Sequence, residues 1–254
     1  MAFNSNTNIV FVNSQGMMRS FKTEDGDGCL ESDTERSLRN PSRDENCLTK
    51  DCIFSEDGKI IATQQASEIL LFEDGTFLYS TLNGDNCFSC VTLSPDGSIL
   101  LYCVQTSDNT QHFYTVDVCK QIKSKCESLI SEIMTVECCC FSPDNTKLIL
   151  CGNFLVEVWQ YPFCSNMPMQ SYQTFSPHNQ SNTFSYCSVS SNNKWLACCI
   201  TNRILICRLD TLTEQRQVPH GHSGRVEYCR FLKGDSYLIS YGLDNIVFLF
   251  DLSE

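Results

Sequence analysis

The sequence predicts an all-β protein built from about five similar units, each made of up to four short strands. A turn-forming motif recurs along the chain, and strand-length apolar runs flank every copy of it. The copies occupy residues 54–58, 93–97, 141–145, 189–193 and 231–235. Measured between Asp57, Asp96, Asp144, Asn192 and Gly234, the steps are 39, 48, 48 and 42 residues. Steps of this size fit a structural unit of about 40–45 residues with loops of variable length.

The recurring motif consists of residues that favour tight turns. Pro fixes φ, Asp or Asn accepts hydrogen bonds from its own backbone, and Gly or Asn tolerates a positive φ. The motif therefore predicts a hairpin turn between the first and second strand of each unit.

The first 46 residues differ from the rest of the chain. Residues 8–13 and 16–22 are strand-like, so residues 1–22 are expected to supply the closing strands of a unit or the remnant of one. Residues 23–46 are charged, polar and almost free of apolar side chains. This composition predicts a long, exposed, disordered loop.

From residue 47 to residue 254, predicted strands precede and follow each turn. The first strands are expected at 51–54, 88–93, 135–141, 184–189 and 226–231, and the second strands at 59–63, 98–104, 147–151, 194–200 and 237–241. The third strands are expected at 68–72, 112–116, 155–161, 204–209 and 246–252. Candidates for outer fourth strands lie at 77–82, 171–175 and 213–218, with a strand or short helix within 119–134.

The last stretch, residues 221–254, carries the clearest pattern. It begins with Gly221-His222, ends with Phe250-Asp251, and holds three strand-length apolar runs between them. This resembles one unit of the WD-repeat family, which starts with Gly-His and ends with Trp-Asp, with Phe in place of the Trp here. The resemblance implies a β-propeller of about five four-stranded blades, with residues 47–254 forming the blades.

The sequence leaves two alternatives for the number of blades. One solution is a closed ring of five blades, in which residues 16–22 add the outer strand of the last unit. The other is a part of a larger propeller, because the commonest ring of the family has seven blades and needs about 300 residues. Residues 8–13 favour this second solution, since they look like the remnant of an earlier blade.

The resemblance also implies roles for residues of the last unit. His222, Ser240 and Asp244 match a hydrogen-bonded set that braces the strands beneath the terminal aromatic residue, here Phe250. A neutral imidazole donates to a carboxylate and accepts from a hydroxyl, so the set satisfies three buried polar groups. Arg225 and Leu243 match the positions through which the family contacts its partners.

The function implied by the resemblance is a non-enzymatic scaffold or adaptor for protein–protein interactions, with no catalytic residue and no cofactor. The alternatives are a propeller-type, metal-dependent hydrolase and an RNA-binding propeller. The hydrolase needs several Asp, Glu, Asn or His side chains converging on a channel, and of the four histidines only His222 belongs to a motif. RNA would have to stack on exposed aromatic and Arg side chains.

The composition narrows the range of partners. The net charge is −12 and the pI is about 4.7, so phosphate backbones and anionic membranes are disfavoured. Proteins or peptides with basic segments are favoured, since complementary charge steers their encounter. No apolar run approaches the about 20 residues of a transmembrane helix, and no apolar secretory core follows Met1. The cytoplasm or the nucleus is the expected compartment.

Cysteine is unusually frequent, with 18 residues. Most of them lie inside apolar strand runs, and residues 138–140 are three in succession. A free Cys in such a position behaves as a small buried hydrophobe. Cys87 and Cys90 form the one C-x-x-C motif, without the second pair or the neighbouring His that a zinc site requires. No metal site is expected.

Overall fold

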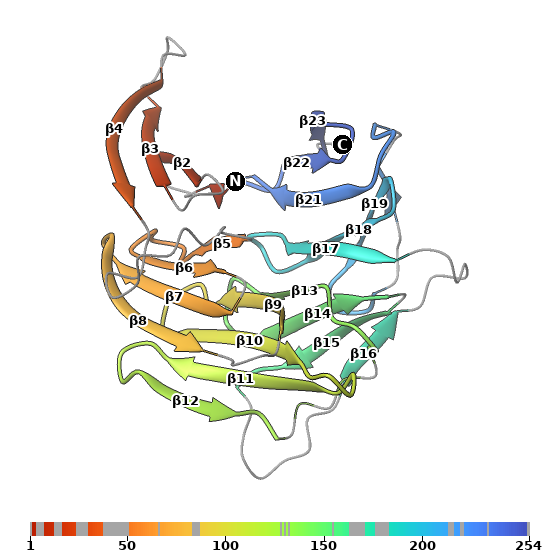
Figure 1. The fold of residues 1–254 in the computed structure, drawn as a ribbon. Coiled ribbons are helices and arrows are strands. Elements are labelled where there is room, and N and C mark those ends of the chain that lie inside the picture. Colours follow the sequence, from red (N-terminus) through yellow and green to blue (C-terminus); the bar gives the residue numbers. More distant parts are fainter. Residues whose placement is uncertain are drawn as a thin grey trace. The chain divides into compact units, whose positions relative to one another are not determined.

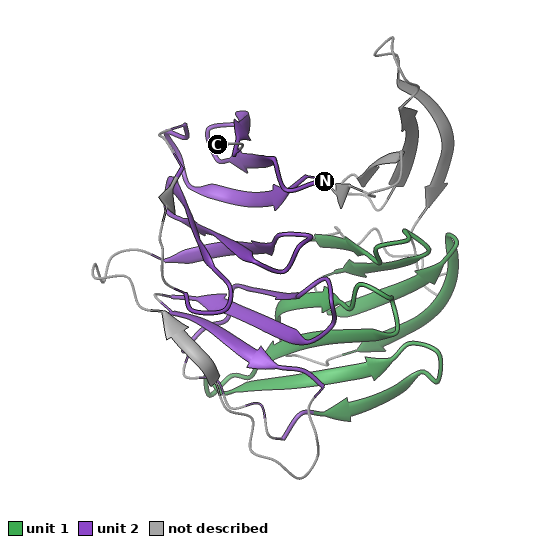
Figure 2. Cartoon of the chain, turned by 180° about the vertical axis from the view of Figure 1, so that it is seen from behind, with its two compact units in different colours: residues 1–125 green, residues 126–254 purple. Residues whose placement is uncertain are grey.

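The structure, a computed structural model, describes residues 2–3, 8–12, 17–23, 30–37, 51–65, 67–82, 87–127, 129, 131, 133–153, 155–162, 171–175, 183–212, 216–218, 221–232 and 234–252. Their regular structure is entirely β-strand, arranged in six antiparallel sheets (Figure 1). The prediction of an all-β fold is therefore confirmed. These residues form no helix, and hence none that is long and apolar enough to cross a membrane. The chain divides into two compact units, residues 1–125 and 126–254 (Figure 2).

The first unit contains three sheets in which the strands follow one another in chain order. The first sheet comprises β1 (Ala2–Phe3), β2 (Asn8–Val12), β3 (Met17–Thr23) and β4 (Leu30–Ser37). The second comprises β5 (Asp51–Phe54), β6 (Ile60–Gln64), β7 (Glu68–Glu73) and β8 (Thr76–Leu82). The third comprises β9 (Cys87–Leu93), β10 (Ile99–Gln105), β11 (Gln111–Asp117) and β12 (Ile122–Lys125).

The N-terminal region differs from the expectation in two respects. β3 pairs with β2 and β4, so residues 17–23 lie inside a sheet of the first unit rather than at the outer edge of the last one. β4 lies within residues 23–46, for which a loop was expected, while 24–29 and 38–46 are outside the described residues. A sheet edge offers backbone hydrogen bonds to any extended segment, so a polar sequence can form a strand without an apolar face.

The second unit also contains three sheets in chain order. They comprise β13 (Cys138–Phe141), β14 (Lys147–Gly152), β15 (Leu155–Gln160) and β16 (Ser171–Phe175); then β17 (Phe184–Val189), β18 (Trp195–Ile200), β19 (Arg203–Arg208) and β20 (Arg216–Gln217); and finally β21 (Val226–Phe231), β22 (Tyr237–Gly242) and β23 (Val247–Asp251). The strands expected on each side of the five turns are confirmed, with ends shifted by a few residues. The outer strands β8, β16 and β20 lie where fourth strands were expected.

Apolar side chains fill the space between neighbouring sheets within each unit. In the first unit, Ala62, Ile69 and Leu71 of one sheet pack with Leu100 and Tyr102 of the next. In the second unit, the first strands β13, β17 and β21 contact one another in turn (Figure 1). The resulting cores are rich in small residues, cysteine above all.

The turn between the first and second strand has the same hydrogen bonds in four sheets. A buried Ser donates its Oγ–H to an Asp or Asn two residues later and accepts the N–H of the residue five positions later: Ser55 with Asp57 and Ile60, Ser94 with Asp96 and Ile99, Ser142 with Asp144 and Lys147, and Ser190 with Asn192 and Trp195. The residue after the Asp or Asn has a positive φ of 58° or 72°, and Gly or Asn occupies it. The turn motif in the sequence therefore corresponds to a single backbone conformation.

Candidate functional site

The side chain of His222 links two loops of the sheet β21–β22–β23. His222 lies just before β21, Ser240 lies on β22, and Asp244 lies in the turn between β22 and β23. His222 Nδ1 is 3.0 Å from Asp244 Oδ1 and 3.1 Å from Oδ2, and His222 Nε2 is 2.7 Å from Ser240 Oγ. The structure thus brings together the three polar residues that the sequence placed in one brace.

The hydrogen bonds fix the position of the imidazole proton. A carboxylate only accepts, so Nδ1 carries the proton and donates it to Asp244. In the neutral imidazole Nε2 then accepts the hydroxyl proton of Ser240. Asp244 also accepts the backbone N–H of Ser223 at 2.8 Å and that of Ile246 at 3.2 Å. The carboxylate therefore holds the loop before β21 and the β22–β23 turn in one arrangement.

These contacts shift the ionisation of Asp244. Burial opposes the charged form, but the hydrogen bonds from His222, Ser223 and Ile246 outweigh it and lower the pKa of Asp244 to about 2 from the ordinary 3.8. The unfolded chain takes up this proton at a higher pH than the folded chain. The brace therefore contributes its full stabilisation above about pH 5, and this contribution is lost as the pH falls from about 4 to 2.

We expect the variant Asp244→Asn to differ from the wild type most at neutral pH and least near pH 2. The free energy of unfolding of both proteins, measured by urea titration at several pH values from 7 to 2, tests this. The gap between them should be constant above about pH 5 and shrink below about pH 4, because protonation removes the same charge that the substitution removes. A gap that does not change with pH would show that the ionised carboxylate is not what stabilises the turn.

The aromatic part of the brace differs from the expectation for Phe250. The ring of Phe248 meets the imidazole of His222 edge-on, with 4.7 Å between the ring centroids. Phe250 stacks on Phe248 and pairs with Leu238 across the ladder. The register explains the difference, because the cross-strand neighbour of Ser240 is Phe248.

The connectivity from Asp244 through His222 to Ser240 resembles that of a hydrolase triad. Its surroundings differ, because the Ser240 side chain is 0% exposed and points into the sheet packing. The small hollow beside His222 is lined by residues such as Asn202, Ile204 and Phe250, and has room for about one water molecule. The geometry suits a structural brace that satisfies buried polar groups.

Arg225 and Leu243, the expected partner-binding residues, lie next to each other. The backbone N–H of Leu243 donates to the carbonyl of Arg225 at 2.8 Å. The Arg225 guanidinium pairs with Glu227 at 3.2 Å, and both of these side chains are about 40% exposed. Leu243 is 63% exposed, which is unusual for a large apolar side chain.

Leu243 lies beside a larger apolar surface, which we call the β22–β23 face. It consists of Tyr237, Ile239, Tyr241, Val247 and Leu249, which share one side of the two strands because Ile239 is opposite Leu249 and Tyr241 is opposite Val247. Six of the nine exposed large apolar residues in the described part of the chain lie between residues 237 and 249. The opposite side of the strands, with Leu238, packs on the sheet β17–β20. This sheet therefore has two apolar sides, and the side chains described on one of them are largely exposed.

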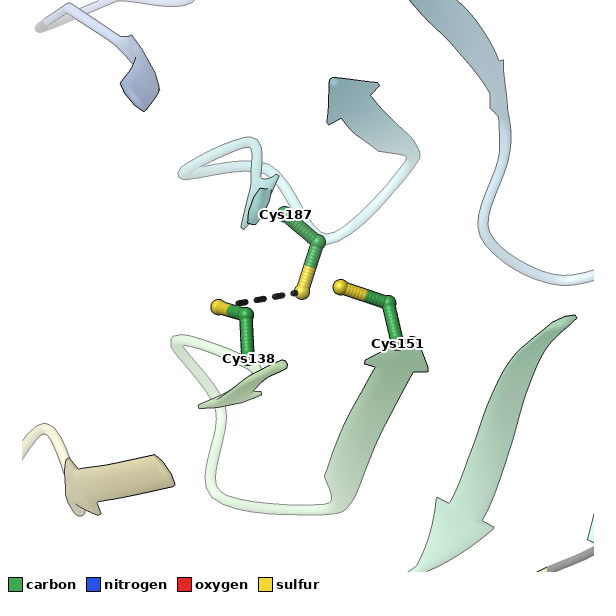
Figure 3. Close-up of side chains that lie close together, drawn as sticks. All are labelled: Cys138, Cys151 and Cys187. Carbon is green, nitrogen blue, oxygen red and sulfur yellow. Dashed lines mark hydrogen bonds between the residues drawn. The ribbon is translucent and has the colours of Figure 1, made fainter. Parts of the chain in front are cut away.

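A cluster of cysteine side chains lies in the core of the second unit. Cys138 on β13 and Cys151 on β14 are opposite each other across the ladder, and Cys187 reaches them from β17 of the next sheet. Their sulfur atoms lie within 4.8 Å of one another (Figure 3). Cys140 joins them, with its Sγ 3.5 Å from that of Cys187. We call Cys138, Cys140, Cys151 and Cys187 the thiol cluster.

Proximity shifts the ionisation of these thiols in opposite directions. The thiols of Cys151 and Cys187 and the backbone N–H of Cys187 donate hydrogen bonds to the Cys138 sulfur, which lowers the pKa of Cys138 well below its ordinary value. The interaction with Cys138, together with burial, raises the pKa values of Cys151 and Cys187. Of these three thiols, Cys138 is therefore the one that ionises most readily.

From the sequence, these cysteines were expected to be plain core residues, and their convergence was not predicted. The signal for half of the cluster was present, since Cys138 and Cys140 alternate along one strand and so share a face. The partners come from β14 and from another sheet, so their proximity depends on pairings that no spacing in the sequence reveals. Of the C-x-x-C motif, Cys90 is opposite Cys103 in the sheet β9–β12, and the side chain of Cys87 lies outside the described residues.

No protein-family model and no curated protein matches the chain.

Proposed function

We propose that this chain is a non-enzymatic platform for protein–protein interactions, built from propeller blades of the WD-repeat type. Four-stranded antiparallel sheets in chain order, spaced about 40–48 residues apart with the same turn after the first strand, support the propeller. The brace of His222, Ser240 and Asp244 supports the resemblance in the last unit. The cytosol or nucleus is the proposed compartment, where core thiols stay reduced.

The observation that carries the proposed function is the β22–β23 face. Soluble proteins rarely expose a contiguous apolar surface unless another molecule covers it. Tyr237 and Tyr241 combine a large apolar area with a hydroxyl group, a property that makes Tyr frequent at interfaces. Leu249 is 61% exposed at the centre of the face and supplies an apolar anchor.

The partner is an extended segment of another protein that adds a strand to β23. In the described residues, β23 pairs with β22 alone, and its sheet has three strands where the other five have four. An open edge offers N–H and C=O groups to an extended peptide, and the adjoining apolar face receives alternate side chains of that peptide. With a chain charge of −12, basic residues at the remaining positions favour its approach.

A peptide-binding titration tests this. A labelled ten-residue peptide that alternates Val and Lys should bind the full chain in fluorescence anisotropy, whereas peptides that alternate Val and Glu, or Ser and Lys, should not. Leu249→Asp should weaken binding at least about tenfold, because it places a charge in the apolar contact. Ile122→Asp is the matched control, since Ile122 is also an exposed apolar residue on an outer strand, and it should leave binding unchanged.

Two outcomes would contradict the proposal. Equal weakening by Leu249→Asp and Ile122→Asp would show that the peptide binds without using the β22–β23 face. No binding of any peptide, together with a lower melting temperature of Leu249→Asp, would show that another part of the same chain covers this face.

A further inference from the structure

Four sulfur atoms from three strands meet in the thiol cluster of the second unit. The sulfur atoms of Cys138, Cys151 and Cys187 lie within 4.8 Å of one another, which is close enough for all three to bind one metal ion. Cys140 supplies a fourth sulfur through its contact with Cys187. We propose that the thiol cluster binds one thiophilic d10 metal ion, Zn²⁺ or Cu⁺.

The spacing of the sulfur atoms suits such an ion. Four sulfurs placed tetrahedrally at about 2.3 Å from a zinc ion are about 3.8 Å apart. The Sγ atoms of Cys138 and Cys187 are 3.8 Å apart, and those of Cys140 and Cys187 are 3.5 Å apart. Both distances are also far longer than the about 2.05 Å of a disulfide bond. The sulfurs of Cys138, Cys151 and Cys187 are therefore spaced for ligands around a shared centre, and the Cys140 side chain has to move toward that centre to complete the site.

The ligand type selects the class of metal. Thiolates favour soft or borderline cations such as Cu⁺ and Zn²⁺ over Mg²⁺ or Ca²⁺, which take oxygen ligands. All four ligands come from strand positions, since the cysteines of the thiol cluster are each paired in a ladder. Binding replaces the thiol protons, which pass to solvent.

The cluster differs from the other cysteine contacts of the core. Cys90 is opposite Cys103 in its ladder, and Cys198 interacts with Cys207 and, more weakly, with Cys151 and Cys229. Among the described residues, however, the three sulfurs that lie within 4.8 Å of one another are those of Cys138, Cys151 and Cys187, which come from both strands of a hairpin and from the next sheet. Cys140 is partly exposed and provides a route by which an ion reaches the buried sulfurs.

Metal titration of the full chain is the first test. The reduced, metal-free protein is equilibrated with Zn²⁺ or with Cu⁺ in separate arms, dialysed against a weak chelator, and analysed for bound metal. We expect one equivalent per chain of one of the two ions, and a higher melting temperature with that ion. Replacement by Co²⁺ should give the visible absorption of tetrahedral cobalt with thiolate ligands. No retained metal in either arm would overturn the proposal.

Alanine variants assign the site. Cys138→Ala and Cys187→Ala should each lose the bound equivalent. Cys207→Ala is the matched control, because Cys207 is equally buried in the same core and lies outside the cluster; it should retain the metal. Retention by all three variants would show that other cysteines of the chain hold the ion.

A measurement on the wild type keeps the proposal testable even where a variant does not fold. Cys140 is partly exposed, so iodoacetamide should alkylate it in the metal-free protein, and bound metal should protect it at least about tenfold in rate. The exposed Cys119 lies in the turn between β11 and β12, away from the cluster in sequence, and should react equally in both states. Equal alkylation of Cys140 with and without metal would exclude it as a ligand and overturn the four-thiol site.

Discussion

Gly152→Ala is expected to destabilise the second unit by about 3 kcal/mol or more, at the upper end of the range for overpacked cores. Gly152 ends β14 and is buried against the chain segment before β13. An added Cβ would overlap the carbonyl oxygen of Thr135 and lie 2.9 Å from both the Thr135 carbonyl carbon and Ile133 Cγ2. Backbone atoms cannot rotate away as a flexible side chain can, so the strand itself would have to move. Urea unfolding followed by circular dichroism measures the effect.

Gly234→Ala provides the matched control in the same unit. Gly234 has a φ of +82°, and a Cβ there meets no atom within 4 Å. This substitution therefore carries only the strain of a left-handed conformation, about 1–2 kcal/mol. Equal destabilisation by the two variants would contradict the close approach of the Thr135 carbonyl to Gly152.

His222→Ala is expected to destabilise the chain by on the order of 1–3 kcal/mol, because it removes a hydrogen-bond partner from two buried groups. Ser240 Oγ loses its contact at 2.7 Å, and Asp244 loses one of its donors while it keeps the backbone N–H groups of Ser223 and Ile246. The edge contact between the imidazole and Phe248 is lost as well. The free energy of unfolding of wild type and variant, measured at pH 7 where Asp244 is ionised, gives the effect.

A double-mutant cycle separates the brace from simple loss of volume. Ser240→Ala removes the other partner of the imidazole, so in the double variant His222→Ala, Ser240→Ala neither group is left unpaired. We expect the double variant to be less destabilised than the sum of the two single variants, by about 1 kcal/mol. Additive effects would show that the two side chains do not interact.

The turns and most strands could be predicted because each depends on residues that are close together in the sequence. The turns at Asp57, Asp96, Asp144 and Asn192 were visible because a Ser, an Asp or Asn and a following Gly or Asn are needed within five residues to make one set of hydrogen bonds. The strands beside them were visible because apolar runs of strand length alternate with these turns. Strand β4 was missed for the same reason, since its sequence carries no apolar run and its pairing depends on β3.

The polar residues of the brace could be predicted because a sequence motif specifies them. The aromatic residue beside the imidazole could not, because it depends on the register of β22 and β23. His222, Ser240 and Asp244 lie within 23 consecutive residues of one sheet, and the resemblance placed all three. The aromatic beside the imidazole is Phe248 rather than Phe250, because the ladder sets Phe248 opposite Ser240. A shift of two residues along a strand preserves the face, so the pattern of apolar residues cannot distinguish the two positions.

The thiol cluster and the β22–β23 face could not be predicted from the sequence, whereas other features of the protein could. The amino-acid sequence contains the turns, the strands, the acidic charge and the polar brace, because each depends on residues close together in the chain or on composition. The meeting of Cys138, Cys151 and Cys187 and the opening of one side of β22 and β23 to solvent depend on which strands pair and which sheets pack. Such contacts join residues far apart in sequence, and their energies are realised only once the sheets have formed.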